Sequence, residues 1–149
     1  REALRSGAVA RTAKYLGRSF EVPGKVVPGS GRGRALGIPT ANLEIWSERA
    51  YPRSGVYACW AEFEGQRHKA VTNIGVRPTF EEKHEQAVVE AHLLDFNADL
   101  YGKELRVAFI ARLRDERRFS SPELLLSRIG RDIQRARVIL EQDAEGQDA

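Results

Sequence analysis

Hydrophobic residues follow the pattern of β-strands through the middle of this chain and the spacing of an α-helix near its end. Runs that are rich in β-branched and aromatic residues, or that alternate between apolar and charged residues, predict strands at residues 55–63, 69–74, 87–94 and 104–113. The link Glu64-Gly65-Gln66 between the first two runs is typical of a β-hairpin. The last run is predicted to bury one face, made of Leu105, Val107, Phe109, Ala111 and Leu113.

After Phe119 the pattern becomes that of one long helix. Ser120-Ser121-Pro122-Glu123 is a helix-start signal, with a hydroxyl cap, Pro in the first turn and Glu three residues after Ser120. The following residues place an apolar stripe on one helix face, made of Leu125, Ile129, Ile133, Ala136 and Leu140. Strands followed by such a helix predict one mostly-β domain of the α+β class, an antiparallel sheet or small barrel with the helix packed on it.

We place this domain at residues 20–140 and expect both ends of the chain to lie outside it. Residues 1–19 are predicted to form a linker with a short helix at Ala8 to Leu16. Residues 141–149 are expected to form a frayed acidic tail.

The composition is that of a folded domain, because 42% of the 149 residues are hydrophobic and 30% are charged. No apolar run approaches the ~18 residues that a membrane helix needs, and no signal-peptide pattern opens the chain. The single cysteine, Cys59, excludes an internal disulfide and a cysteine-rich zinc site. We therefore expect a reducing, cytoplasmic location.

The net charge of +3 is unevenly divided along the chain. The tail at 141–149 carries four acids and no base, which leaves +7 on residues 1–140. A positive body of this size is compatible with binding to nucleic acid and with binding to one small polyanion. Composition alone does not choose between them.

Residues 24–34 combine four glycines and three cations with no acid. Glycines let backbone N–H groups turn toward an anion, and the cations add positive charge. The segment matches neither a Walker A loop nor a G-x-G-x-x-G fingerprint. It predicts either a phosphate-binding loop or a flexible loop without a ligand.

Thr40 and Asn42 lie two residues apart in Pro39-Thr40-Ala41-Asn42. If this segment is extended, both side chains project to the same face. A hydroxyl and an amide oxygen side by side are hard, neutral ligands that suit Mg²⁺ together with phosphate oxygens and water. The alternative is that both side chains bond to nearby backbone in a turn.

Glu90 lies in a predicted strand whose two faces both carry apolar residues. We therefore expect its carboxylate to face a cavity or pocket, where it can serve as a general base. The alternative is an ordinary solvent-facing glutamate.

Six motifs occur in order along residues 15–140. They are Gly-Arg-Ala-Leu-Gly-Ile-Pro-Thr-Ala-Asn (33–42), Gly-Val-Tyr (55–57), Asn-Ile-Gly-Val-Arg-Pro-Thr-Phe (73–80), Val-Glu-Ala-His (89–92), Asp-Leu-Tyr-Gly-Lys (99–103) and Leu-Arg-Asp-Glu-Arg-Arg-Phe (113–119). Together they closely resemble riboflavin kinase, the flavokinase module of bacterial bifunctional FAD synthetases.

The resemblance implies a six-stranded antiparallel β-barrel of Greek-key type with the C-terminal helix packed on it. It also implies the reaction, transfer of the γ-phosphoryl group of ATP to the ribityl 5′-hydroxyl of riboflavin, which gives FMN and ADP.

By the same resemblance, Glu90 is the catalytic residue, and Thr40 and Asn42 bind Mg²⁺, which arrives with ATP. The nucleotide residues implied are Lys25, Gly29, Gly31, Arg32, Gly33, Arg34 and Tyr101. The flavin residues implied are Arg114, Glu116 and Phe119.

Two points qualify the resemblance. Asp115-Glu116 stands where Pro-Glu is more usual, which leaves the contacts of the flavin loop less secure. Residues 1–19 resemble the end of an adenylyltransferase module, and the chain has no Met at position 1. We therefore expect a longer parent protein in which that module converts FMN to FAD.

Two other functions compete with the kinase. A nucleic-acid-binding barrel would suit the positive body, but the aromatic residues Tyr57, Trp60 and Phe63 are grouped with aliphatic ones, as in a core. A flavin-binding module without catalysis would need neither Glu90 nor the pair Thr40 and Asn42. We therefore expect ATP and riboflavin as partners, and neither nucleic acid nor a membrane.

Overall fold

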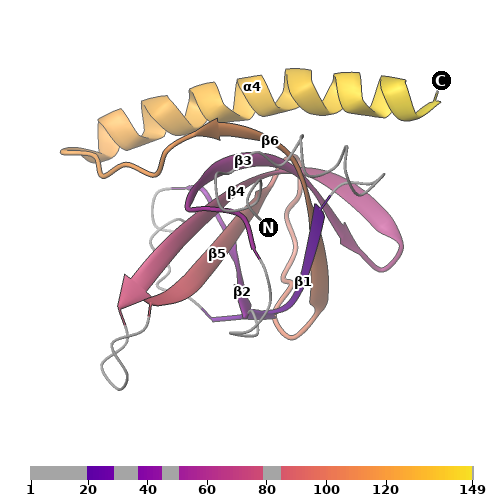
Figure 1. The fold of residues 1–149 in the computed structure, drawn as a ribbon, viewed down its shortest axis with the longest axis horizontal. Helices are drawn as coiled ribbons and strands as arrows, with labels where there is room; N and C mark the ends of the chain where they lie inside the picture. The colour runs from indigo at the N-terminus through magenta and orange to yellow at the C-terminus, as the bar shows by residue number, and fades with distance from the viewer. Residues whose placement is uncertain (1–19, 29–36, 45–50, 79–84, 149) are drawn as a thin grey trace.

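The described part of the chain forms six strands and one helix (Figure 1). The computed structural model describes residues 20–28, 37–44, 51–78 and 85–148. The elements are β1 (Phe20–Val27), β2 (Ala41–Glu44), β3 (Gly55–Phe63), β4 (Gln66–Pro78), β5 (Glu85–Leu93), β6 (Glu104–Arg114) and α4 (Pro122–Asp148). The predicted N-terminal helix and most of the glycine-rich segment lie outside the described residues.

The strands close into a barrel in the order β1-β2-β5-β4-β3-β6, and every neighbouring pair is antiparallel. Strands β3, β4 and β5 follow one another as hairpins, and β6 returns to lie beside β3, which is the Greek-key arrangement. The predicted six-stranded antiparallel barrel is therefore confirmed.

The predicted hairpin joins β3 to β4 through a two-residue turn. Phe63 pairs with Gln66, and Glu64 and Gly65 both have positive φ angles, 51° and 80°. Two successive left-handed residues are typical of the tight turns that match the twist of antiparallel strands. This turn fixes which residues of β4 lie opposite β3.

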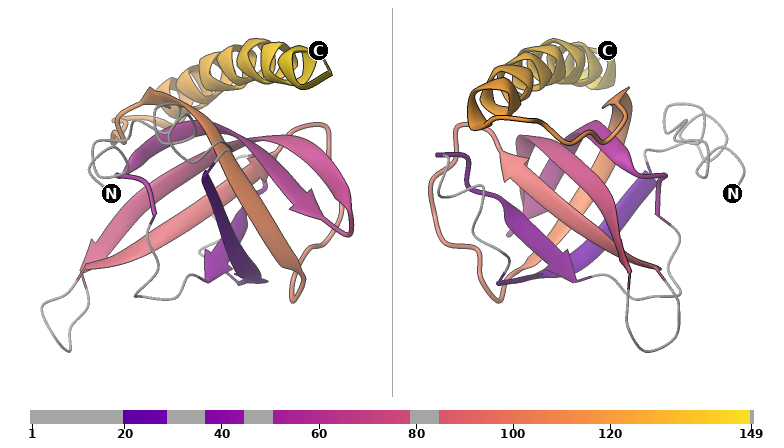
Figure 2. Two further views of the ribbon diagram at one scale, coloured as in Figure 1. Left: turned by 45° about the vertical axis from the view of Figure 1, so that its right-hand side comes forward. Right: turned by 90° about the vertical axis from the view of Figure 1, so that its left-hand side faces the viewer.

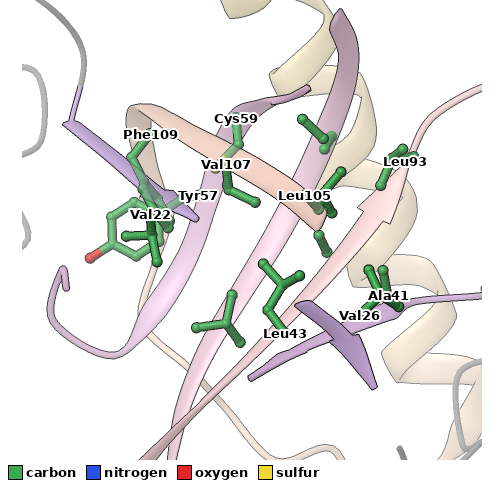
Figure 3. Close-up of a cluster of buried hydrophobic side chains, with 14 of the residues drawn as sticks. Val22, Val26, Ala41, Leu43, Tyr57, Cys59, Leu93, Leu105, Val107 and Phe109 are labelled. Atoms are coloured by element: carbon green, nitrogen blue, oxygen red, sulfur yellow. The ribbon is translucent and has the colours of Figure 1, made fainter. Parts of the chain in front are cut away.

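The barrel interior is filled by apolar side chains from all six strands (Figure 3). Its largest members are the rings of Tyr57 and Phe109, which meet edge to face with centroids 5.3 Å apart. Both faces of β3 are buried over most of its length, one inside the barrel and the other against the helix.

Helix α4 lies along one side of the barrel, where it contacts β3, β4 and β6 (Figure 2). Fully buried Ala136 and Leu140 pack against Trp60, Val71 and Leu113 on the outer surface of these strands. The predicted apolar stripe is thus the face that the helix buries, and Ile133 of the stripe packs at its margin.

The prediction that β6 buries a single face is wrong for the second half of the strand. Leu105, Val107 and Phe109 point into the barrel, but the pairing with β3 shifts register after Phe109, and Leu113 packs under the helix. An irregularity of this kind inserts an extra residue, so the alternation of faces changes. The same strand therefore serves both cores.

The start of α4 differs by one residue from the expected cap. Leu124 N–H donates to Ser121 Oγ at 3.2 Å, so Ser121 caps the helix and Pro122 takes the first helical position. The expected acidic tail is helical as far as Asp148. Contacts with the barrel hold its first turns, since Trp60 Nε1 donates to Asp143 Oδ2 at 2.8 Å and Lys69 pairs with Glu141 at 3.3 Å.

The only cysteine offers a direct test of this core. Cys59 is fully buried inside the barrel, and burial raises the pKa of its thiol above the ordinary value. We expect the folded chain at pH 8 not to react with a thiol reagent such as DTNB until urea unfolds it. Rapid labelling of the native chain, at the rate of the urea-unfolded sample, would show that this strand is not packed as described.

Candidate active site

A pocket of about 430 Å³ opens at one end of the barrel, between β1, the start of β2 and the 96–101 loop. Thr40 and Tyr101 are among its polar lining groups. Its apolar lining comes from Val26, Ala41, Ala91, Leu93 and Leu100. The structure therefore brings together two predicted site residues that are far apart in the sequence.

The loop that carries Tyr101 is fixed to the edge of the barrel by backbone hydrogen bonds. Val26 N–H donates to Lys103 O at 2.9 Å, and Gly102 N–H donates to Val26 O at 3.0 Å. Tyr101 N–H donates to Asp99 Oδ1 at 2.9 Å, while the Tyr101 side chain is 50% exposed at the pocket mouth. The ring is thus held at the opening and left accessible.

Asn42, Glu90 and Asn73 form a row across three neighbouring strands. Asn42 on β2 pairs with Glu90 on β5, and Glu90 also pairs with Asn73 on β4. Residues directly opposite in antiparallel strands project to the same face, with Cβ atoms roughly 4.5–5.5 Å apart. The predicted metal ligand Asn42 and the predicted base Glu90 are therefore direct neighbours.

This row faces outward from the barrel. Its neighbours along the three strands, such as Ala41, Ile74 and Ala91, are buried in the interior, so the alternate side chains point out. Glu90 is half-buried on this outer face and is not part of the pocket lining. Among the described residues Glu90 thus projects from the outer face of the barrel, and the predicted pocket in front of its carboxylate stays a prediction.

His92 holds the start of β2 against β5. Its Nδ1 lies 2.8 Å from Pro39 O. Because a carbonyl oxygen only accepts, Nδ1 carries the proton in this contact. The hydrogen bond fixes the backbone immediately before Thr40, just beyond the last paired residue, Ala41.

Arg114 is tied to the helix by a buried ion pair. Its Nε and Nη2 lie 2.9 Å and 2.8 Å from Asp132 Oδ2, and the Arg114 and Asp132 side chains are only 10% and 1% exposed. The guanidinium also lies over the Phe119 ring, 5.6 Å from its centroid. Of the three predicted flavin residues, Arg114 is thus the one that holds the β6–α4 connection together.

Asp115 anchors the same connection. Arg112 Nη2 donates to Asp115 Oδ1 at 2.6 Å, and Arg53 lies 3.5 Å from the same oxygen. The hydrogen bond from Arg112 lowers the pKa of this carboxyl, so Asp115 remains charged at neutral pH. Asp115 therefore attaches the loop to the barrel.

Glu116 crosses the outer face of β4 at Gly75. A Cβ atom built on Gly75 would lie 2.5 Å from Glu116 Oε2, so only glycine allows this approach. Gly75 is two residues from Asn73 on the same face of β4. Glu116 thus reaches the β4 end of the row that contains Glu90.

The predicted phosphate segment is only partly described. Gly29, Gly31, Arg32, Gly33 and Arg34 lie outside the described residues. Lys25 is exposed on β1, where Glu44 and Glu104 are its register partners on the two sides. It is not part of the pocket lining, so the structure does not join it to Thr40 and Tyr101.

The donors at Thr40 and Asn42 are chemically suited to Mg²⁺. Thr40 lines the pocket, Asn42 lies two residues further along in the outward-facing row, and both side chains carry neutral oxygens of the kind that Mg²⁺ accepts. Within the described residues there is no group of three or more histidine, cysteine, aspartate or glutamate side chains that could hold a metal.

Sequence reasoning missed the contacts of His92 and Asp132 and the pairing of Asn73 with Glu90. Asp132 lies on the helix face that carries Ile129 and Ala136, so a charge on an apolar stripe was an available signal. The contact of His92 with Pro39 and the pairing of Asn73 with Glu90 join distant segments. Both become visible only once the strand register is known.

The chain matches the family model for riboflavin kinase (flavokinase) over residues 16–140. It is 39% identical to the bifunctional riboflavin kinase/FMN adenylyltransferase of Bacillus subtilis, over 91% of this chain and 43% of that protein. It is 41% identical to the Pseudomonas fluorescens protein of the same description, over 93% of this chain and 44% of that protein. The chain thus spans less than half of these curated relatives.

Two solved structures share the fold. A protein from Streptococcus pneumoniae described as a macrolide-efflux protein matches with a TM-score of 0.87 and 34% identity, over 91% of this chain and 44% of that one. Riboflavin kinase from Trypanosoma brucei matches with a TM-score of 0.62 and 25% identity, over 81% and 79%. In the part of the chain that the structure describes, no helix is long and apolar enough to cross a membrane.

Proposed function

The chain belongs to the riboflavin kinase family, and we propose that it transfers the γ-phosphoryl group of ATP to the ribityl 5′-hydroxyl of riboflavin, with Glu90 as the base. The observation that carries this proposal is the direct pairing of Asn42 with Glu90. It sets a residue suited to hold a metal-bound phosphate beside a carboxylate suited to take a proton. Phosphoryl transfer depends mainly on such positioning and on neutralisation of charge.

We propose that Thr40 and Asn42 bind Mg²⁺ through their side-chain oxygens and that the ion arrives with ATP. When bound, Mg²⁺ neutralises phosphate charge and orients the phosphate oxygens. His92 fixes the backbone before Thr40 and so keeps the two proposed metal ligands in place. Because both ligands are neutral, the chain should bind the ion weakly when no nucleotide is present.

Glu90 accepts the proton of the riboflavin hydroxyl as that oxygen attacks the γ-phosphorus. The new oxygen–phosphorus bond forms, the bond to the β-phosphate oxygen breaks, and ADP leaves. An alcohol is a weak nucleophile, so a positioned base is expected to contribute roughly 10²–10⁴ in rate. The half-buried position of Glu90 on β5 supports this role, since the strand fixes its direction.

We propose that the nucleotide occupies the pocket at the barrel end, with Tyr101 at its opening and the glycine-rich segment 24–34 over its phosphates. The pocket's apolar lining suits the flat face of a base. The flavin lies toward β4, where Glu116 and Phe119 contact it and Arg114 supports the loop through Asp132. The two substrates then meet at the row that contains Glu90.

The metal assignment predicts a loss of nucleotide binding. Thr40→Ala combined with Asn42→Ala should abolish the Mg²⁺-dependent part of ADP affinity, because both proposed ligand oxygens are removed. Calorimetric titration of ADP with and without Mg²⁺ measures this, and Gln134→Ala, an exposed amide on α4, is the control. Normal Mg²⁺-dependent affinity in the double variant would refute the site.

The relatives' descriptions extend the proposal beyond this chain. Because they are bifunctional, we propose that the kinase works beside an FMN adenylyltransferase module that uses its product.

The positions of the aromatic residues do not support the competing function, nucleic-acid binding. Tyr57 is buried in the barrel, and Trp60 is 7% exposed, with Asp143 on its Nε1 and the Arg67 guanidinium 4.1 Å from its ring centroid.

A further inference from the structure

The row on the outer face contains one residue that the proposed reaction has not yet used. Asn73 lies opposite Glu90 on the side away from Asn42. Its side-chain oxygen Oδ1 is buried and has no hydrogen-bond partner in the described structure. A buried acceptor without a donor is unfavourable, and a ligand hydroxyl that donates to it would remove that cost.

The order of the row restricts what that partner is. Asn42 lies on the β2 side of Glu90, and Thr40, two residues before Asn42, lines the pocket where the proposed phosphate donor binds. The riboflavin hydroxyl that receives the phosphoryl group must approach Glu90 from the side opposite the leaving group, so that its oxygen lies in line with the γ-phosphorus. The remaining neighbour in the row is Asn73 on β4.

The flavin loop approaches the same strand. Glu116 lies against Gly75, two residues from Asn73 on the same face of β4. The chain between the reacting hydroxyl at Glu90 and a ring beside Glu116 would therefore pass Asn73. In riboflavin that chain is the ribityl group, which carries further hydroxyl donors next to the terminal one.

We propose that Asn73 is a substrate-binding residue whose Oδ1 accepts a hydrogen bond from a ribityl hydroxyl of riboflavin and so positions the 5′-hydroxyl at Glu90. This inference rests on the proposed riboflavin kinase function. It assigns the contact to the ribityl chain and not to the flavin ring.

The test compares two variants of similar size. Asn73→Leu removes the acceptor, and Asn73→Gln keeps a neutral amide oxygen without placing a second carboxylate opposite Glu90. Riboflavin affinity is measured by quenching of flavin fluorescence. We expect Asn73→Leu to weaken riboflavin binding about tenfold and Asn73→Gln to stay within about threefold of the parent chain, while melting temperatures and Mg·ADP affinity change little.

Lumiflavin, which has the ring but no ribityl chain, separates the two possible contacts. Its affinity should be the same in the parent chain and in Asn73→Leu. Unchanged riboflavin affinity in a folded Asn73→Leu variant would overturn the inference, as would an equal loss in both variants or an equal loss for lumiflavin. If the parent chain itself fails to bind riboflavin, the proposed function fails instead.

Discussion

Replacement of Glu90 by glutamine should lower the turnover number of riboflavin phosphorylation at least a hundredfold while leaving the fold intact. The amide keeps the size and hydrogen-bonding reach of the side chain but cannot take the proton of the attacking hydroxyl. Because Glu90 lies on the outer face of β5, its replacement leaves the buried interior unchanged. Steady-state production of FMN measures the effect, and the thermal melting curve verifies the fold.

The matched control is Glu104→Gln, an exposed strand glutamate on β6 that lies outside the row and the pocket lining. Its turnover should stay within about twofold of the parent chain. If Glu90→Gln retains normal turnover, the base has been assigned wrongly. If the Glu90→Gln variant has low turnover and also shows no cooperative melting transition, the role of Glu90 is structural.

The largest expected effect on stability comes from Asp132→Ala, which breaks the buried pair with Arg114. Removing one partner of a buried ion pair leaves the other charge without compensation and costs about 3–5 kcal/mol. This is a large part of the total stability of a domain of this size, typically about 5–15 kcal/mol. Urea unfolding measures the loss. Arg128 Nε also lies 3.7 Å from Asp132 Oδ1, so the apolar double replacement Arg114→Met with Asp132→Leu should recover only the part of the loss that comes from Arg114.

Asp95→Ala is the matched exposed control. Arg137 Nη1 and Nη2 lie 2.7 Å and 3.0 Å from the Asp95 carboxylate, so this pair has a similar geometry and also attaches α4 to the barrel. The Asp95 side chain is 74% exposed, however, and solvent screens the pair. The hydrogen bond from Arg137 lowers the pKa of Asp95, so its contribution is present at neutral pH and is lost only in acid. Equal losses of stability from Asp95→Ala and Asp132→Ala would contradict this explanation.

Local patterns in the sequence were sufficient to predict the elements whose periodicity is regular. The β3–β4 hairpin follows from its turn and its β-branched residues, and α4 follows from its cap and apolar stripe. The prediction of a closed barrel rested on the family motifs, because the four residues of β2 give too short a pattern to identify a strand.

What the sequence could not predict depends on contacts between distant segments. The register shift in β6 moves Leu113 from the barrel interior to the helix interface, and no local pattern marks that position. The outward direction of Glu90 required the pairing of β5 with both β2 and β4. The same pairing placed Asn73 beside Glu90.

The most direct test of the kinase assignment is one assay on the purified chain. Riboflavin, ATP and Mg²⁺ are incubated with the chain, and the flavin and nucleotide products are separated and quantified. We predict that FMN and ADP appear in equal amounts, that both require riboflavin, and that Glu90→Gln forms them at least a hundredfold more slowly. A folded chain that produces no FMN, or that releases ADP without it, would contradict the assignment.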